Sequence, residues 1–196
     1  KRSVVSAGIV IRGSPFLSVM LWFAFCYFHH YHKCLRCAVI PSRLKFAEVT
    51  MAITVRALRA DDYSQWRPLW DGYTHFYDCY LEESVTASTW ERALSDRSQM
   101  FCRVVEKNEK VIGFAMCILH EGTWSTAPIC YLEDLFVDAD ERGAGAGKAL
   151  IDALIAEGKR EGWSKLYWVT RENNPARKLY DKYGQADDYV RYRITL

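Results

Sequence analysis

The residues with the clearest chemical potential form a glycine-rich run just ahead of a segment with helical spacing. It reads Arg142-Gly143-Ala144-Gly145-Ala146-Gly147-Lys148. Small residues let a backbone approach a ligand closely, and the first-turn amides of a helix are unpaired and point outward. The run therefore predicts a loop that holds phosphate groups at the positive end of a helix dipole.

Two familiar phosphate-binding patterns do not fit this run. The Walker pattern fails because Ala149 stands where it requires Ser or Thr. The dinucleotide pattern Gly-x-Gly-x-x-Gly fails because its third glycine would fall on Lys148 or Leu150. What remains is Arg-x-x-Gly-x-Gly, from Arg142 to Gly147. For this run alone, a flexible loop without a ligand is the alternative.

The elements that must position this loop follow from hydrophobic periodicity. The order is one strand, two helices, three strands, then helix, strand, helix and strand, with a hairpin turn at Asn108-Glu109 and a helix stop at Gly162. The expected strands are 53–57, 100–106, 111–120, 129–137, 166–170 and 189–194, and the expected helices are 61–77, 86–95, 145–161 and 175–183. This order predicts an α/β fold with a mixed sheet.

The net charge of +2 hides a split between two parts of the chain. Residues 1–50 hold seven basic residues and one acidic residue, a net of +6, whereas residues 51–196 hold 19 basic and 23 acidic residues, a net of −4. The composition excludes a disordered chain, a collagen and a disulfide-stapled miniprotein. A mildly acidic domain favours a cationic partner over nucleic acid.

Residues 1–50 form a basic, partly apolar leader ahead of the domain at 51–196. Their apolar stretch, residues 14–28, is shorter than the about 20 residues of a spanning helix. An upstream translated extension before Met51, a targeting or anchor segment, and a folded or disordered module remain open. Cys34-x-x-Cys37 is at most half of a zinc site, so no metal is expected. Cys79, Cys102, Cys117 and Cys130 are expected to be buried thiols of a reduced, cytoplasmic protein.

Two separated motifs resemble the GNAT superfamily of acetyl-CoA-dependent N-acetyltransferases. Arg142-x-x-Gly145-x-Gly147 is similar to the coenzyme A loop, and residues 173–184 are similar to the second signature, Asn-x-x-Ala-x-x-Leu-Tyr followed by Gly. The Tyr131-Leu-Glu-Asp strand and the aromatic residues around it look most like the fungal and bacterial histone-and-polyamine group. Gln185 stands where the family usually has Phe. The resemblance covers residue 53 to the C-terminus and implies a mostly antiparallel sheet flanked by helices.

The resemblance also implies roles for single residues. Acetyl-CoA would be the co-substrate, attacked directly by an amine in a ternary complex. Glu133 is the expected base, with Asp134 in reserve, and Tyr180 is the expected acid for the thiolate. The expected cofactor contacts are Leu135, Phe136, Val137, Arg142, Gly143, Ala144, Gly145, Ala146, Gly147, Lys148, Asn173 and Tyr180.

The acceptor is left open between a polyamine, a small amine, an amino acid and a protein lysine. Tyr77, Trp124, Glu133 and Asp134 are the expected acceptor contacts. In a regular strand Glu133 and Asp134 point to opposite faces, although a bulge could alter this. A non-catalytic coenzyme-A-binding regulatory domain is the alternative function. No nucleic-acid partner and no membrane are expected, and a homodimer is an analogy only.

Overall fold

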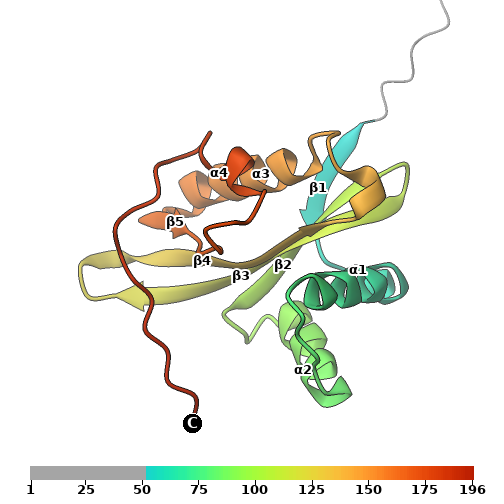
Figure 1. The fold of residues 1–196 in the computed structure, drawn as a ribbon, viewed down its shortest axis with the longest axis horizontal. Coiled ribbons are helices and arrows are strands. Elements are labelled where there is room, and N and C mark those ends of the chain that lie inside the picture. Colours follow the sequence, from blue (N-terminus) through green and yellow to red (C-terminus); the bar gives the residue numbers. More distant parts are fainter. Residues whose placement is uncertain (1–51) are drawn as a thin grey trace, which may run out of the picture. The chain divides into compact units, whose positions relative to one another are not determined.

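Five strands form a single sheet that organises the fold (Figure 1). The structure is a computed structural model and describes residues 52–196. β1 (Ile53–Ala57), β2 (Met100–Lys107), β3 (Lys110–Gly122) and β4 (Ser125–Val137) pair antiparallel in this order. β5 (Lys165–Tyr167) pairs parallel to β4. The mixed, mostly antiparallel α/β sheet is therefore confirmed.

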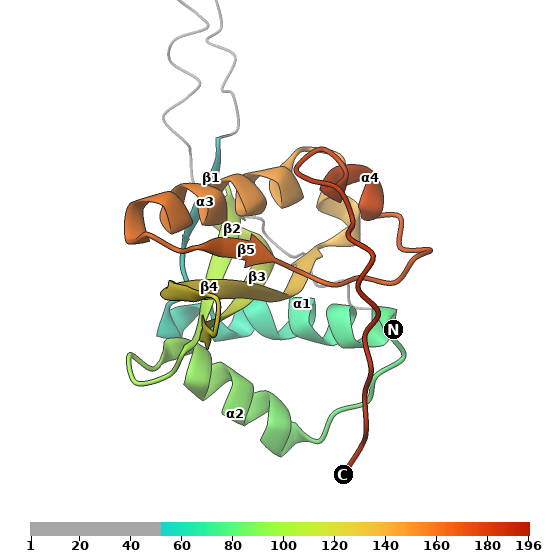
Figure 2. The same cartoon turned by 90° about the vertical axis from the view of Figure 1, so that its left-hand side faces the viewer.

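The helices cover both faces of the sheet (Figures 1 and 2). α1 (Tyr63–Phe76), which follows the short turn η2 (Ala60–Asp62), lies with α2 (Glu83–Leu94) on one face. α3 (Ala146–Glu161) and α4 (Arg177–Tyr180) lie on the other face. Another short turn, η3 (Ala139–Glu141), joins β4 to the glycine-rich loop.

Each face of the sheet has its own hydrophobic core. On the α1 face the apolar spacing of the helix buries Trp66, Leu69 and Trp70 against Phe114 of β3. The rings of Trp66 and Trp70 are stacked, with centroids 5.3 Å apart. On the α3 face Leu150 and Leu154, among others, pack against strand residues. The two cores hold α1 and α3 against the sheet, next to β4 and the glycine-rich loop.

Two local turn signals in the sequence are confirmed. Asn108 (φ 52°) and Glu109 (φ 63°) adopt the left-handed conformation that a tight hairpin between β2 and β3 requires. Gly162 (φ 73°) ends α3, and left-handed backbone at a helix end favours glycine.

The expected strand at 189–194 is wrong. This segment forms no ladder with any strand in residues 52–196, and its apolar side chains, Tyr189, Val190, Tyr192 and Ile194, are exposed. Alternation makes a strand feasible, but a strand forms only where its backbone pairs with a neighbour, and this segment leaves the outer edge of β5 unpaired. Similarly, β5 ends at Tyr167 rather than at residue 170, and α4 is shorter than expected. Cys79 is exposed, unlike the three strand cysteines.

The expectations for residues 1–50, including the Cys34-x-x-Cys37 pair and the apolar stretch, lie outside the described residues. Within residues 52–196, none of the helices combines the length and the apolar character needed to cross a membrane.

A partly buried ion-pair network ties β1 and β2 to the start of α1. Asp62 is 3% exposed and binds both terminal nitrogens of Arg56, at 2.7 and 2.8 Å, while Arg56 also bonds Glu106 at 2.8 Å. The backbone N–H of Arg59 donates to Asp62 at 2.8 Å. Burial opposes ionisation of Asp62, but these hydrogen bonds outweigh it and hold the pKa of Asp62 below its ordinary value.

Asp62→Asn should therefore lower the free energy of unfolding by about 3 kcal/mol at neutral pH, because it leaves Arg56 without its buried partner. Because the folded-state pKa of Asp62 is depressed, this stabilisation is present above its unfolded pKa of about 3.9 and is lost as the pH falls through the folded value. Urea unfolding curves at several pH values measure it. Asp61→Asn, at an exposed neighbour, is the control, and equal losses in the two variants would contradict the assignment.

Candidate active site

The sheet opens where β4 and β5 separate. The two strands pair only over Ile129–Tyr131 of β4 and Lys165–Tyr167 of β5, while β4 continues beside β3 to Val137. A pocket lies at this opening. Its wall contains residues of β4, of the chain after β5, of α1 with the residue that follows it, and of α4: Tyr73, Tyr77, Leu132, Glu133, Leu135, Trp168, Val169, Thr170 and Tyr180.

A β-bulge in β4 shapes the pocket. Asp134 is opposite Met116 and Leu132 is opposite Cys117, so Glu133 is an extra residue in the pairing with β3. Leu132 and Leu135, three residues apart, both belong to the core under α3. Glu133 and Asp134 between them lie close enough for the charge of Glu133 to act on Asp134. In a regular strand Glu133 and Asp134 would point to opposite faces of the sheet, and the bulge removes this constraint.

The two carboxylates have raised pKa values. Burial, together with the charge of Glu133, raises the pKa of Asp134 to about 6, and the hydrogen bond from the Tyr73 hydroxyl opposes this rise. Burial also raises the pKa of Glu133, against the positive charge of Arg191. A carboxylate whose pKa lies near neutral can accept and release protons under ordinary conditions.

Tyr73 links the pocket to Asp134. Its ring lies on the pocket wall and packs edge-on against Tyr77, Phe114 and Phe136, with centroids 5.2 to 6.3 Å apart. Burial and the nearby Asp134 charge raise the pKa of Tyr73 far above its ordinary value, so the hydroxyl keeps its proton. From the sequence, Tyr73 is one of the aromatic residues of the first helix that could line the acceptor pocket, but its link to Asp134 is not predicted.

Tyr180, the expected acid, lies in the same pocket as Glu133. Its ring packs edge-on against Trp168, with centroids 5.4 Å apart. Burial first, and the nearby Tyr77, raise the pKa of Tyr180 to about 12, so its hydroxyl is protonated at neutral pH. A protonated phenol is what the transfer of a proton to a thiolate requires.

Asn174, rather than Asn173, fixes the chain around Tyr180. Its side-chain oxygen accepts from the backbone N–H of Ala176 at 2.9 Å, and its amide nitrogen donates to Thr170 at 2.8 Å and to the hydroxyl of Tyr77 at 3.3 Å. Asn173, the expected contact, is exposed on the preceding loop. Asn174 could have been recognised as an Asn placed three residues ahead of the short helix that begins at Arg177.

The glycine-rich loop has the geometry of an anion cradle. Gly143 (φ 83°) and Gly145 (φ 90°) adopt left-handed backbone, and a Cβ added at either would meet no atom within 4 Å. α3 begins immediately afterwards at Ala146, which is buried, whereas Ala144 is exposed. The space beside the two glycines is open, and the free amides of the first turn of α3 are available to an anion. Gly147 instead provides close packing, because a Cβ there would lie 3.2 Å from Leu179.

The two cations at the ends of the loop have structural partners. The Arg142 Nε donates to the carbonyl of Val137 at 3.0 Å, and its guanidinium lies 5.4 Å from the centre of the Phe136 ring. Arg142 therefore anchors the loop to the end of β4. Lys148 pairs with Asp152 at 2.6 Å.

Trp124 is not brought to the pocket. It lies in the turn between β3 and β4 and is 93% exposed, and it is not among the residues that line the pocket. The prediction that Trp124 lines the acceptor site is therefore not supported by this geometry. Tyr77, Glu133 and Leu135 do line the pocket, while Phe136 packs against Tyr73 in the α1 core and Val137 is buried in the other core.

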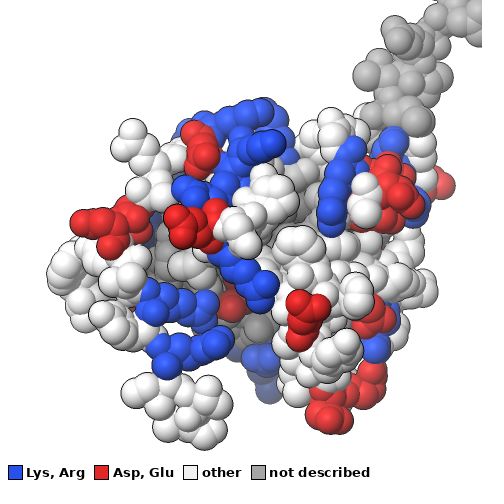
Figure 3. Space-filling view, in the orientation of Figure 1, with Lys and Arg blue, Asp and Glu red and all other residues white. Residues whose placement is uncertain are grey.

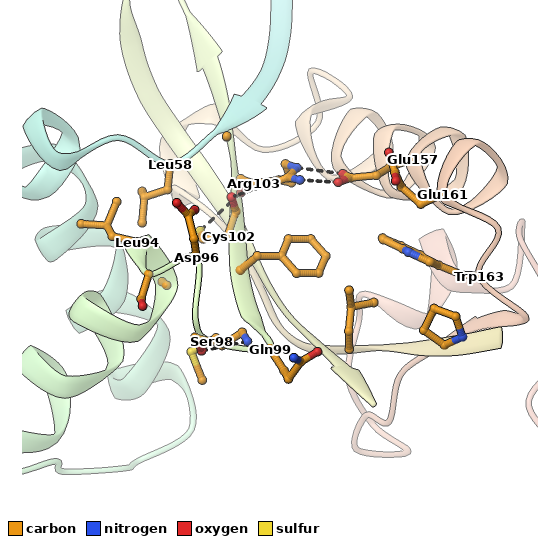
Figure 4. Close-up of a pocket in the computed structure, with 17 residues that line it drawn as sticks. Leu58, Leu94, Asp96, Ser98, Gln99, Cys102, Arg103, Glu157, Glu161 and Trp163 are labelled. Atoms are coloured by element: carbon orange, nitrogen blue, oxygen red, sulfur yellow. Dashed lines mark hydrogen bonds and ion pairs between the residues drawn. The ribbon is translucent and has the colours of Figure 1, made fainter. Parts of the chain in front are cut away.

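A larger hollow of about 530 Å³ lies elsewhere, along β2 beyond the end of β1 (Figure 4). Its wall includes the ion pair between Arg103 of β2 and Glu157 of α3, and the rings of Phe101 and Trp163. None of the predicted site residues lines this hollow. Its size would favour this hollow as the site, but Glu133 and the three tyrosines Tyr73, Tyr77 and Tyr180 line the smaller pocket at the opening between β4 and β5.

Comparison with known families agrees with this location. Residues 59–185 match the model of the acetyltransferase (GNAT) family. The chain belongs to this family. The matched region contains β4, the glycine-rich loop and α4, so all the residues of the pocket lie within the GNAT domain. The expected enzyme class, an N-acetyltransferase, is confirmed.

Several relatives of this GNAT domain have named activities. The chain is 28% identical to D-amino-acid N-acetyltransferase of Saccharomyces cerevisiae over 144 residues, which cover 72% of this chain and 89% of the yeast protein. It is 29% identical to thialysine N-epsilon-acetyltransferase of Bos taurus over 136 residues, 69% of this chain and 66% of that protein. The crystal structure of ribosomal-protein-alanine N-acetyltransferase from Brucella melitensis biovar Abortus 2308 superposes with a TM-score of 0.60 at 26% identity, covering 74% of this chain and all of that chain.

Acetyltransferases of the GNAT family take the acetyl group from acetyl-CoA. The described residues fit this molecule, because the loop offers open space and free amides to its phosphates while the opened sheet leads to Tyr180. Within residues 52–196, no three His, Cys, Asp or Glu side chains are grouped as metal ligands.

Gly145→Ala should weaken acetyl-CoA binding about tenfold, because left-handed backbone costs a non-glycine residue about 1–2 kcal/mol. The new Cβ would also enter the open space beside the loop. Calorimetric titration with coenzyme A measures the affinity. Gly184→Ala is the matched control, since its Cβ also meets no atom within 4 Å but its φ is not left-handed. Equal affinities in the two variants would refute the cradle.

Proposed function

We propose that this protein transfers the acetyl group of acetyl-CoA to a primary amine held between the β4 carboxylates and Tyr180. The observation that carries the proposal is the meeting of Glu133, Tyr73 and Tyr180 in one pocket beside an open glycine loop. The pocket therefore combines negative charge for an ammonium group with a protonated phenol for a leaving thiolate.

Side chains of this protein can account for every proton that moves during the acetyl transfer. Acetyl-CoA supplies its acetyl group as the C–S bond breaks and an N–C bond forms. Glu133, on the pocket wall, attracts the ammonium form of the acceptor, and a carboxylate takes one proton from it to give the attacking amine. Tyr180 gives its hydroxyl proton to the sulfur and is reprotonated by the second proton from nitrogen. One proton is released to solvent overall.

Asp134 is the better proton acceptor of the two carboxylates. Its pKa of about 6 is close to neutral, and catalytic bases work best when their pKa is near the operating pH. The Tyr73 hydroxyl lies between the pocket and Asp134, and it can pass a proton to Asp134 while taking one from the amine. The prediction that Glu133 itself is the base is the competing assignment, and the pH experiment below separates the two.

The activities named for the relatives favour, as the acceptor of this protein, the amino group of an amino acid. D-amino acids, thialysine and the alanine of a ribosomal protein are the acceptors named for three of them. The polyamine or histone preference that the Tyr131-Leu-Glu-Asp strand favours stays a prediction. The acidic pair suits the amine of either class.

Tyr180→Phe should lower kcat about 100-fold, as loss of a general acid typically does, and leave acetyl-CoA affinity unchanged. Release of free thiol across a panel of amines measures turnover. Tyr183→Phe is the control, because its hydroxyl bonds Asp152 on α3 at 2.7 Å and does not line the pocket. Full activity of Tyr180→Phe with several amines would exclude Tyr180 as the acid. Binding of acetyl-CoA without turnover on any amine would indicate a regulatory domain instead.

The pH dependence of kcat/KM should show an acid limb at about pH 6, since a base must be deprotonated and burial raises the pKa of Asp134 to that value. Activity falls as the pH drops through this value. Tyr73→Phe should lower kcat/KM, because it removes the proton relay, and should move the remaining limb to higher pH, because it also removes a hydrogen bond that favours the ionised carboxylate.

Two variants decide which carboxylate titrates. Asp134→Asn should abolish the limb together with most of the activity, whereas Glu133→Gln should raise KM and keep the limb. The reverse pattern would make Glu133 the base. Asp96→Asn, at an exposed carboxylate outside the pocket, should leave the profile unchanged.

A further inference from the structure

The pocket that contains Glu133 and Tyr180 is small. Its volume is about 20 Å³, whereas the hollow along β2 has about 530 Å³. A space of this size holds about one group as large as a water molecule, and an ammonium group is of that size. The reacting nitrogen of an acceptor can therefore enter, while the carbon that carries it must lie at the mouth of the pocket. The residues at the mouth then decide which amines can react.

The mouth of the pocket lies where Tyr77 meets the loop between β5 and α4. Val169 and Thr170 of this loop line the pocket and are exposed, so they mark the side that is open to solvent. Asn174 joins the two walls, because its amide nitrogen donates both to the hydroxyl of Tyr77 at 3.3 Å and to Thr170 at 2.8 Å. The hydroxyl end of Tyr77 therefore lies at the mouth as well.

Tyr77 depends on support from outside its own helix. It directly follows α1, and the next residue, Asp78, has left-handed backbone (φ 53°) that turns the chain away. The Tyr77 ring contacts Tyr73 and Phe76 edge-on, with centroids 5.2 and 5.0 Å apart. Because helix ends fray, a ring at this place needs contacts from another segment to keep one position.

Arg171 and Asn174 hold Tyr77 at three points. The guanidinium of Arg171 lies over the Tyr77 ring, 4.9 Å from its centre, and also donates to the Tyr77 carbonyl at 3.4 Å. Asn174 binds the hydroxyl at the far end of the same ring. A shift of the ring would break contacts with both residues, because its face, its hydroxyl and its backbone are all engaged. We call Arg171 and Asn174 the Tyr77 clamp.

The loop that carries the Tyr77 clamp is itself anchored to α4. The side-chain oxygen of Asn174 accepts from the backbone N–H of Ala176 at 2.9 Å, and Arg177 donates to the carbonyl of Glu172 at 3.0 Å. Figure 3 shows Lys and Arg side chains gathered over α4, the helix to which Arg177 belongs. Since α4 also carries Tyr180, the clamp keeps Tyr77 in one position relative to the acid.

We propose that Arg171 and Asn174 are specificity-determining residues, because they hold Tyr77 as a size filter at the mouth of the pocket. An amine on an unbranched CH₂ carbon passes this filter, whereas a branch on that carbon meets the fixed ring. Within an amino acid, a terminal side-chain amine fits, and the α-amine, whose carbon is branched, is disfavoured. The inference rests on the proposed function and narrows its acceptor class beyond primary amines in general.

Butylamine and sec-butylamine test the filter, because these isomers differ in whether the carbon that carries the nitrogen is branched. Both are offered to the full chain at fixed acetyl-CoA, with free thiol as the readout. The wild-type protein should give a kcat/KM at least about tenfold higher for butylamine, since a pocket wall can discriminate one methyl group by that amount. The ratio of the two isomers cancels any loss of active protein, so poor folding of a variant does not change it.

Two variants loosen the Tyr77 clamp while keeping the ring. Arg171→Lys keeps the charge but loses the planar contact with the ring. Asn174→Ser keeps an oxygen for the N–H of Ala176 but is too short to reach the Tyr77 hydroxyl. Either change should raise kcat/KM for sec-butylamine about fivefold and lower the isomer ratio. In a Tyr77→Ala background neither change should alter the ratio further, because the clamp acts through Tyr77.

Arg177→Lys is the matched control, because Arg177 also bonds a loop carbonyl, but that of Glu172 rather than that of Tyr77. It should leave the isomer ratio unchanged. Equal use of the two isomers by the wild-type protein, an unchanged ratio in Arg171→Lys and Asn174→Ser, or the same change in Arg177→Lys would overturn the filter and leave the acetyltransferase proposal intact. A chain that releases no thiol with any amine would instead overturn the proposed function, and the inference with it.

Discussion

The pocket depends on one extra residue in β4. If β4 kept regular pairing with β3, strict alternation would direct Glu133 and Asp134 to opposite faces, and one of them would enter the apolar core under α3. Because Glu133 is inserted between Leu132 and Asp134, Leu132 and Leu135 both remain in that core. Both carboxylates are then available to the α1 side, where Tyr73 meets Asp134. The bulge thus allows β4 to contribute residues to the apolar core and, at the same time, two carboxylates to the proposed active site.

β4 also connects the pocket near Tyr180 to the glycine-rich loop, which is expected to hold phosphate groups. β4 loses β5 after Tyr131 and ends at Val137, whose carbonyl holds Arg142 at the start of the glycine loop. The opening is therefore framed by rigid elements rather than by loops alone, with the α1 aromatics on one side and α4 on the other. Such a frame fixes the distance between an anion at α3 and a reacting group near Tyr180, which catalysis by orientation requires.

The sequence predicted most clearly those features whose cause lies in the residues themselves. Gly162, the Asn108-Glu109 turn and the glycine loop have backbone requirements that few other residues meet, and they were placed correctly. Features that depend on a neighbour were missed. The segment 189–194 alternates but does not pair with the free edge of β5, the pairing of β5 with β4 ends at Tyr167, and Trp124 lies in a hairpin turn. The bulge at Glu133 is a property of the β3–β4 register and has no local sequence signal.

The positions of the charged groups at the pocket say more about its ligand than the net charge of the domain does. The domain from residue 51 has a net charge of −4, which alone would suggest a simple attraction for cations. At the pocket, however, burial raises the pKa values of the two carboxylates, and Arg191 opposes this rise at Glu133. Because the pKa of Asp134 is raised to about 6, the site loses part of its negative charge as the pH falls toward that value, so its attraction for an ammonium group depends on pH as well as on the net charge of the domain.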